Sequence, residues 1–150
     1  MLRRIRKFTR LSGKEKLLFI EGYITLAFFR SALLLLPFER LTRPLTQKKS
    51  KNWITLLPFT TLQTGLDISR AICRAANNTP WESACLVQAL SAYRMLQRRS
   101  IPGVFYLGVM KDETSEEKMK AHAWTEVGEK IVTGGAGHEQ YSVIAVYKWG

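Results

Sequence analysis

Residues 85–96 read Cys-Leu-Val-Gln-Ala-Leu-Ser-Ala-Tyr-Arg-Met-Leu, an apolar run of helical composition that begins on a cysteine. Further along, residues 121–124 read Ala-His-Ala-Trp, which is typical of a strand. The first turn of a helix favours a thiolate, because its unpaired N–H groups and the positive end of the helix dipole stabilise negative charge. A neighbouring imidazole can hold the proton that the thiol loses. We therefore predict that Cys85 is a nucleophile and that His122 is its base.

Ordinary packing is the alternative interpretation of Cys85, because free cysteines are often buried as small hydrophobic residues. The residues before it favour a helix start instead, since Thr79 is suited to cap a helix and Pro80 to enter one. The other cysteine, Cys73, lies on an amphipathic stretch between Ile72 and an arginine, and we predict a structural role for it.

The chain has 150 residues, of which 46% are hydrophobic, and this length suits one domain with an appendage. Its two cysteines cannot form a disulfide framework, and no signal peptide is expected from its basic first residues, so we expect a reduced cytoplasmic protein. Glu116 and Glu117 have no metal-ligand spacing to His122 or His138. We therefore expect neither a metal nor a cofactor.

The net charge of +11 lies almost entirely in the first third of the chain. Residues 1–51 hold 13 Lys or Arg against 3 Glu, whereas residues 52–150 hold 10 Lys or Arg against 9 acidic residues. A basic segment of this kind can attract nucleic acid, an anionic membrane surface or an acidic protein partner. No base-reading motif follows it, so we expect no nucleic acid among the partners and leave peripheral membrane association open.

The stretch from Leu17 to Leu36 is apolar nearly all the way round, and Ser12 with Glu15 has capping-box spacing at its start. Glu21 and Arg30 leave uncharged stretches that are too short for a comfortable membrane span. A helix this apolar still needs cover. The rest of the domain, a partner protein and a membrane interface remain open, and we expect a docking surface for a partner.

A change in composition divides the chain after this stretch. Residues 47–52, Gln-Lys-Lys-Ser-Lys-Asn, are the expected linker. We predict that residues 1–50 form a basic arm and an apolar helical region, and that residues 51–150 form a compact domain.

The pattern from residue 51 onward predicts an α+β fold, with the cysteine-bearing helix packed on an antiparallel sheet whose second or third strand carries His122. Gly128 and Glu129 are the expected turn of a hairpin. The expected helices cover 62–76 and 82–99, and the expected strands cover 104–109, the His122 segment, the two arms of the 125–132 hairpin, and 141–147.

Several motifs in order resemble the lasso-peptide leader peptidases, which are stand-alone bacterial cysteine proteases of transglutaminase-like fold. The cysteine-then-histidine order is also that of papain-like enzymes. The resemblance covers about residues 62–147, and the capped Leu-rich segment before it is similar as well. The motifs are Thr79-Pro80-Trp81-Glu82-Ser83-Ala84-Cys85-Leu86, Arg98-Arg99-Ser100-Ile101-Pro102-Gly103, Tyr106-Leu107-Gly108-Val109, Ala121-His122-Ala123-Trp124 and Gly134-Gly135.

The resemblance implies a specific activity and specific partners. Its members remove the leader from a ribosomally made precursor peptide, which a leader-binding protein delivers, and an ATP-dependent lasso cyclase then acts on the freed amine. By position, Cys85 would be the nucleophile and His122 the base, with the Cys85 N–H and a second donor holding the oxyanion. Trp81 is a candidate for lining that site, with plain packing as its alternative.

The chain departs from the resemblance at the third triad member. Family members often place an Asp twelve residues after the histidine, and Gly134 occupies that position here. Counting back along the expected hairpin puts His122 opposite Gly135, so no side chain is expected there to orient the imidazole. The remaining candidates are Glu139, which is weak, its neighbours at 138 and 140, a backbone carbonyl and a water.

Three function classes therefore follow from the sequence. The first is the leader peptidase, the second is a catalytically impaired relative that serves as a scaffold for precursor and cyclase, and the third is a basic membrane-surface binding module. Intact Cys85 and His122 favour the first over the second.

Overall fold

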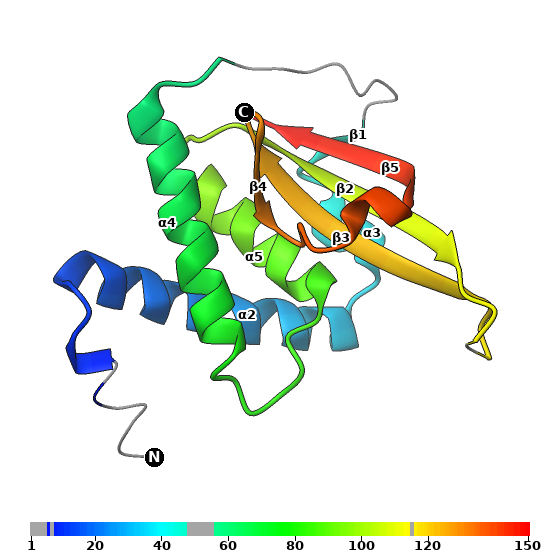
Figure 1. Cartoon of the computed structure of the whole chain (residues 1–150), viewed down its shortest axis with the longest axis horizontal. Helices are drawn as coiled ribbons and strands as arrows, with labels where there is room; N and C mark the ends of the chain where they lie inside the picture. The colour runs from blue at the N-terminus through cyan, green and yellow to red at the C-terminus, as the bar shows by residue number, and fades with distance from the viewer. Residues whose placement is uncertain (1–5, 7, 48–55, 115) are drawn as a thin grey trace.

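A computed structural model describes residues 6, 8–47, 56–114 and 116–150. Four helices and five strands of the described chain form two layers (Figure 1). The helices are α2 (Gly13–Leu35), α3 (Phe38–Thr42), α4 (Phe59–Ala76) and α5 (Cys85–Gln97). The strands are β1 (Thr46–Gln47), β2 (Gly103–Lys111), β3 (Met119–Val127), β4 (Lys130–Thr133) and β5 (Ser142–Trp149), with a short 3-10 helix, η1 (His138–Gln140), before β5.

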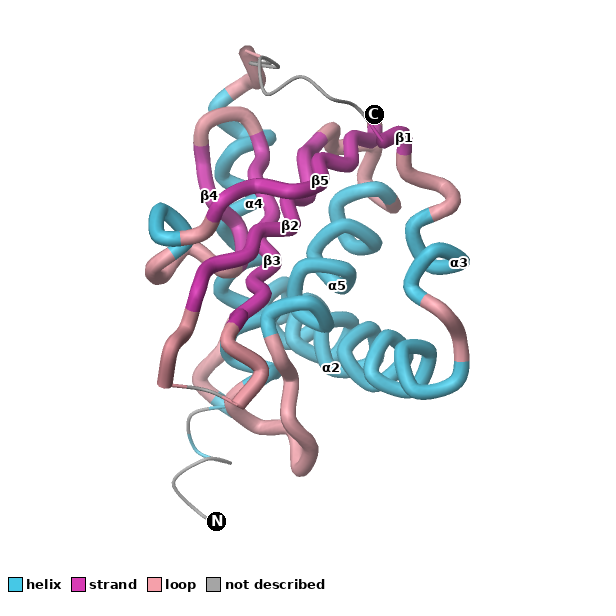
Figure 2. Tube along the Cα trace, turned by 90° about the vertical axis from the view of Figure 1, so that its right-hand side faces the viewer, coloured by secondary structure: helices cyan, strands magenta, loops and turns pink. Residues whose placement is uncertain are grey.

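The strands form one antiparallel sheet in the order β1-β5-β2-β3-β4. His122 lies on β3, the third strand along the chain, which pairs with β2 and β4. The predicted α+β class and the cysteine-bearing helix against an antiparallel sheet are therefore confirmed. Figure 2 shows the sheet on one side and α2, α3 and α5 together on the other. Between the layers lies a core that includes Phe105, Ile72, Leu90 and Leu96, all fully buried.

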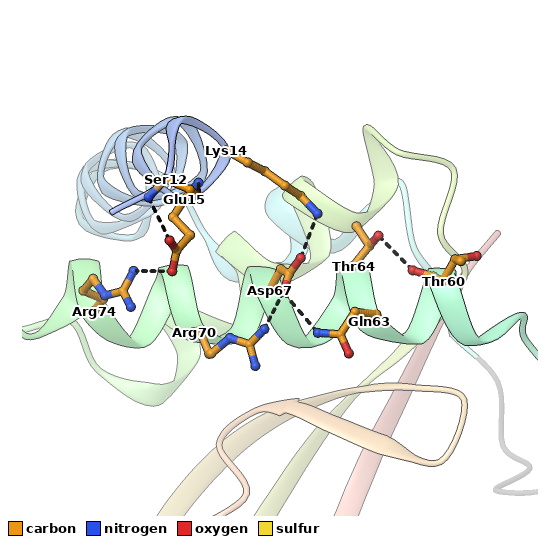
Figure 3. A network of polar contacts seen from close by, with 9 residues as sticks. All are labelled: Ser12, Lys14, Glu15, Thr60, Gln63, Thr64, Asp67, Arg70 and Arg74. Carbon is orange, nitrogen blue, oxygen red and sulfur yellow. Dashed lines mark hydrogen bonds and ion pairs between the residues drawn. The ribbon is translucent and has the colours of Figure 1, made fainter. Parts of the chain in front are cut away.

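One face of α2 packs against α4 and α5, so the domain supplies part of the cover that this apolar helix needs. Gly22 is buried at this contact and faces Ala71 and Ala75 of α4. Glu21 accepts two hydrogen bonds from Arg99 beyond the end of α5, at 3.1 and 2.7 Å. Figure 3 shows further contacts at the start of α2, where Lys14 binds Asp67 and Glu15 pairs with Arg74 of α4.

Two of the predicted local features are present in the structure and one is not. The capping box of Ser12 and Glu15 is present, and the hairpin turns at Gly128-Glu129 with Val127 opposite Lys130. The sequence suggested Thr79 as the cap of α5, and this is wrong, because α5 begins only at residue 85 with Ala84 as its N-cap. Instead the Thr79 hydroxyl lies 3.0 Å from the Ala76 carbonyl and 2.9 Å from the Trp81 carbonyl, and so shapes the turn that leads to α5.

Two predictions concern the N-terminal region. By length and composition, α2 is long and apolar enough to cross a membrane, with a mean hydropathy of 1.6, although a third of that stretch is buried inside the protein. The predicted linker beyond Gln47 and the predicted boundary at residues 50–51 lie outside the described residues.

Candidate active site

Cys85 is the first residue of α5, which is the position that the sequence predicted for a reactive thiol. Its side chain is half-buried and packs against the hydrophobic core. The N-cap residue Ala84 has no side-chain oxygen, so no side chain caps the free N–H groups of the first turn. Those N–H groups are suited to hold an oxyanion. The second donor that an oxyanion needs was not identified from the sequence.

The loop before α5 is held by side-chain contacts to its backbone. Gln88, one turn into the helix, donates from Nε2 to the Ser83 carbonyl at 2.7 Å. The Thr79 and Ser83 hydroxyls are 2.9 Å apart. These contacts fix the chain on both sides of Ala84, so Cys85 is presented from a turn that does not depend on a capping side chain.

Trp81 packs at the same corner and does not project freely into a site. Its ring meets that of Tyr23 on α2 edge-on, with centroids 5.4 Å apart. Within the described part of the chain, its buried indole N–H has no hydrogen-bond partner. Packing between α2 and the loop before α5 accounts for the ring, and the site-lining role stays a prediction.

His122 lies near the start of β3 and has three defined contacts. The Gly134 carbonyl accepts a hydrogen bond from Nε2 at 2.7 Å, which leaves Nδ1 as the nitrogen without a proton in the neutral ring. The imidazole stacks on Trp124 at 5.9 Å between centroids and lies 4.9 Å from the ring of Tyr141. The imidazole is therefore oriented, and it is oriented by the main chain.

A hydrogen bond between α5 and β3 fixes how the two predicted catalytic residues are placed. Thr125 is fully buried and donates from its hydroxyl to the Ala89 carbonyl at 3.3 Å. In Figure 1, α5 and β3 run in the same direction. Cys85 precedes Ala89 by about 6 Å along the helix and His122 precedes Thr125 by about 10 Å along the strand. The two residues thus lie toward the same end of the helix–strand pair.

The side chains of Cys85 and His122 are not in contact in this structure. Ala123 and Thr125 are buried on the helix side of β3, so strand alternation points His122 to the other face. The described contacts of His122 are those with Gly134, Trp124 and Tyr141, and none joins it to Cys85. Their pairing therefore stays a prediction.

An aromatic cluster surrounds the imidazole on this face of the sheet. The Tyr106 ring stacks on Trp124 at 5.3 Å, and His138 packs on the same tryptophan at 5.5 Å. Burial, followed by the nearby Glu126 carboxylate, raises the pKa of Tyr106 to about 12, so its hydroxyl stays protonated and donates to Glu126. A shallow depression of about 290 Å³ lies here, lined by Tyr106, Trp124, Glu126, His138, Glu139, Tyr141 and Val143.

The weak candidate for the third triad member, Glu139, does not orient His122. Its side chain is 73% exposed, and its carboxylate pairs with Nδ1 of His138 at 3.4 Å. His138 itself binds the Gly135 carbonyl at 2.7 Å. The backbone carbonyl was among the alternatives that the sequence left open, and Gly134 supplies it.

The register of the hairpin explains why the strand count was wrong by one residue. Glu126 pairs with Ile131, but Thr125 pairs with Thr133, so the ladder shifts by one residue between these pairs. His122 is therefore not opposite Gly135, as the count predicted, and β4 ends before reaching it. Gly134 has φ +73°, and a Cβ there would lie 2.3 Å from the Ala123 carbonyl oxygen. Only glycine fits where this chain turns to present its carbonyl.

The second cysteine differs from its predicted role. Cys73 is exposed on the outer side of α4, so it does not pack in the core as a structural cysteine would. Asn77 donates to its sulfur at 3.8 Å. Within the described residues, no group of three or more His, Cys, Asp or Glu could hold a metal ion.

A scan against known protein families matches residues 26–146 to a family described as the transglutaminase-like superfamily. The chain belongs to this superfamily. Searches of curated proteins and of solved structures give no match. The transglutaminase-like superfamily generally comprises cysteine-based enzymes and includes cysteine peptidases. The matched range contains Cys85, His122 and Gly134, and it begins within α2.

Proposed function

We propose that this transglutaminase-like protein is a cysteine peptidase that removes the leader from a ribosomally synthesised lasso-peptide precursor. Its partners would be the precursor, a leader-binding protein and an ATP-dependent cyclase, and its place of action the cytoplasm. The motifs around Cys85, His122 and Gly134 support the lasso-specific part of this proposal, and the superfamily match supports its coarser part.

The observation that carries the proposal is the hydrogen bond from His122 Nε2 to the Gly134 carbonyl. In a nucleophile–histidine–acceptor arrangement, one ring nitrogen faces the acceptor and the other takes the proton of the nucleophile. Gly134 stands where the similar enzymes have an aspartate, and its main chain provides the acceptor that its side chain lacks. A histidine that only packs in the sheet would also satisfy its N–H with a carbonyl, so the test of the proposal is cleavage.

The chemistry follows from these roles. Nδ1 of His122 takes the thiol proton, and the Cys85 thiolate attacks the carbonyl carbon at the end of the leader. The first-turn N–H groups of α5 hold the oxyanion, the C–N bond breaks, and the imidazolium protonates the leaving amine of the core peptide. Water then hydrolyses the thioester, which releases the leader carboxylate and restores the thiol.

This chemistry requires a movement. His122 projects from the face of β3 that points away from α5. The imidazole and the thiol therefore have to meet around the start of that strand, near Ala121. A shift of the start of β3 that keeps the hydrogen bond from His122 Nε2 to the Gly134 carbonyl would bring them together when substrate binds.

The decisive experiment incubates the purified protein with the precursor peptide encoded beside its gene, together with the leader-binding protein. Mass spectrometry should detect the free leader and the core peptide. A protein with Cys85→Ala should give neither product. Failure of the intact protein to cleave any neighbouring precursor, with all partners present and the fold verified by circular dichroism, would contradict the proposal.

A scaffold without activity is the second candidate, and Gly134 is the observation that favours it, because a triad carboxylate is missing. A scaffold would bind precursor and cyclase without releasing the leader. It would bind equally well after Cys85→Ala and His122→Ala, whereas a peptidase would trap uncleaved precursor only in those variants. The same binding and cleavage assays therefore separate the two candidates.

A further inference from the structure

The outward face of α2 exposes large apolar side chains along its whole length. They are Leu17 (70% exposed), Ile20 (47%), Ile24 (62%), Phe28 (61%), Leu34 (70%) and Leu35 (81%), and Leu36 (40%) follows directly. We call this set the α2 outer face. A monomeric soluble protein rarely exposes a contiguous apolar surface of this kind without binding something there.

The spacing shows that these side chains form one stripe. Positions 17, 20, 24, 28 and 35 recur at intervals of three, four or seven residues and so share one side of the helix. The buried positions of α2, Leu18, Gly22, Thr25, Leu26, Phe29 and Ala32, lie on the opposite side. In Figure 2, α2 forms the edge of the helical layer farthest from the sheet. The stripe therefore faces outward from the molecule.

The inner side of α2 is part of the core of the domain, because Leu18, Leu26 and Phe29 are at most 5% exposed, and spanning a bilayer would remove them from that core. Lys14 binds Asp67 at 2.8 Å, as Figure 3 shows, and Glu21 binds Arg99 at 2.7 Å. The stripe is therefore available only as a face that lies flat on a surface. That geometry is the one adopted by interfacial amphipathic helices.

The charges around the stripe decide which surface fits. Both acidic residues of α2 are engaged on its inner side, Glu15 with Arg74 and Glu21 with Arg99. Exposed arginines lie before the stripe, at Arg6 and Arg10, and after it, at Arg40 and Arg43. Glu39 is also exposed at the second end, and residues 1–51 as a whole still carry a balance of +10.

We propose that the α2 outer face binds the surface of an anionic membrane. Its apolar side chains would enter the boundary between head groups and acyl chains, and the flanking arginines would contact lipid phosphates. A second copy of the chain fits less well, because pairing two such faces would bring two strongly basic regions together. An acidic protein partner would also complement the flanking arginines, and the test below separates it from a membrane.

The test measures sedimentation of the full chain with vesicles. Half of the lipid is phosphatidylglycerol in one set and all of it is phosphatidylcholine in the other. We expect at least tenfold stronger partitioning onto the anionic vesicles, weakened by added salt because exposed charges are screened. The double substitution Ile24→Glu/Phe28→Glu should reduce that partitioning at least tenfold. Ile144→Glu is the matched control, because Ile144 on β5 is exposed to the same 62% as Ile24 and should change nothing.

A second measurement does not depend on the acidic variants folding. Ile24→Cys or Ile144→Cys, in a protein with Cys73→Ala and Cys85→Ala, carries an environment-sensitive fluorophore. Anionic vesicles should shift the emission of the probe at position 24 to the blue and leave that at position 144 unchanged. Equal shifts at both positions, or no binding to anionic vesicles by the intact chain, would overturn the proposal. A dimer in light scattering that Ile24→Glu/Phe28→Glu dissociates, or binding of this face only to an acidic protein, would overturn it as well.

Discussion

Two helices of this protein begin in opposite ways. At the start of α2, Ser12 accepts a hydrogen bond from the Glu15 N–H at 3.2 Å, and the Glu15 carboxylate accepts one from the Ser12 N–H at 2.9 Å. At the start of α5, the N-cap is Ala84, which can accept nothing through its side chain, and the next residue is Cys85. A capping residue typically stabilises a helix by about 1 kcal/mol.

Under the proposed function, the difference separates a helix start that serves stability from one that serves chemistry. A side-chain oxygen over the first turn of α5 would occupy the N–H groups that an oxyanion needs, and a carboxylate there would oppose a thiolate at Cys85. The capping box of α2 has no such conflict, because nothing reacts there. The following predictions test this contrast, beginning with the largest expected effect.

Cys85→Ala should reduce leader cleavage by a factor of at least about 10⁴, because a removed nucleophile cannot be replaced by its partners. Mass spectrometry of the products measures the loss. Cys73→Ala is the control, and it should cleave normally, since Cys73 lies in the last turns of α4 and is exposed. Normal cleavage by Cys85→Ala together with lost cleavage in Cys73→Ala would show that the start of α5 does not carry the nucleophile.

His122→Ala should lower cleavage by about 10²- to 10⁴-fold, the range for a lost general base. It should also slow alkylation of Cys85 by iodoacetamide at neutral pH, while Cys73 in the same molecule reacts at an unchanged rate. Peptide mapping measures both rates at once. An unchanged ratio of the two rates would mean that the imidazole never reaches the thiol.

Gly134→Ala should lower the free energy of unfolding by roughly 3 kcal/mol, because a Cβ there meets the Ala123 carbonyl at 2.3 Å and the residue has φ +73°. Cleavage should fall as the acceptor of His122 moves. Gly137→Ala separates the two causes, since Gly137 has φ +72° but no neighbouring atom closer than 3.9 Å. Denaturant titration should therefore show a smaller loss of stability for Gly137→Ala.

Ala84→Asp should stabilise the protein and impair it at the same time. The new carboxylate would cap the first turn of α5, with a gain of about 1 kcal/mol, and would slow cleavage by at least about tenfold. Ala84→Asn adds a neutral cap and should impair cleavage less than the charged one does. A capped variant that cleaved at full rate would show that the first-turn N–H groups of α5 take no part in the reaction.

Ser12→Ala should cost about 1 kcal/mol of stability, or roughly 2–4 °C in Tm, and leave cleavage of a saturating precursor unchanged. Thermal unfolding followed by circular dichroism measures the first effect. A large loss of activity at full occupancy would mean that the start of α2 is coupled to the reaction, and the contrast between the two helix starts would fail.

The sequence predicted the elements that depend on local pattern. The capping box, the Gly128-Glu129 hairpin and the placement of Cys85 in the first turn of its helix are all encoded by residues within a few positions of one another. The start of α5 was misjudged because Thr79 has the chemistry of a cap. It uses that hydroxyl to hold the preceding turn instead.

What the sequence could not predict depends on long-range geometry. The one-residue shift in the β3–β4 ladder is not visible as a motif, and it made the count that placed His122 opposite Gly135 wrong by one residue. The face of β3 from which His122 projects, and its stacking on Trp124 and Tyr141, follow from the packed sheet. The exposure of Cys73 was likewise missed, because its apolar neighbour Ile72 suggested burial.

The carbonyl of Gly134 has one consequence for how the reaction responds to acid. A carboxylate that orients a histidine gains a proton as the solution becomes acidic, and its support for the ring is then lost. An amide carbonyl has no such proton to gain, so the orientation of His122 should persist at any pH at which β3 and β4 remain folded. A search for three reactive side chains would also miss this site, because the third group is the backbone carbonyl of Gly134.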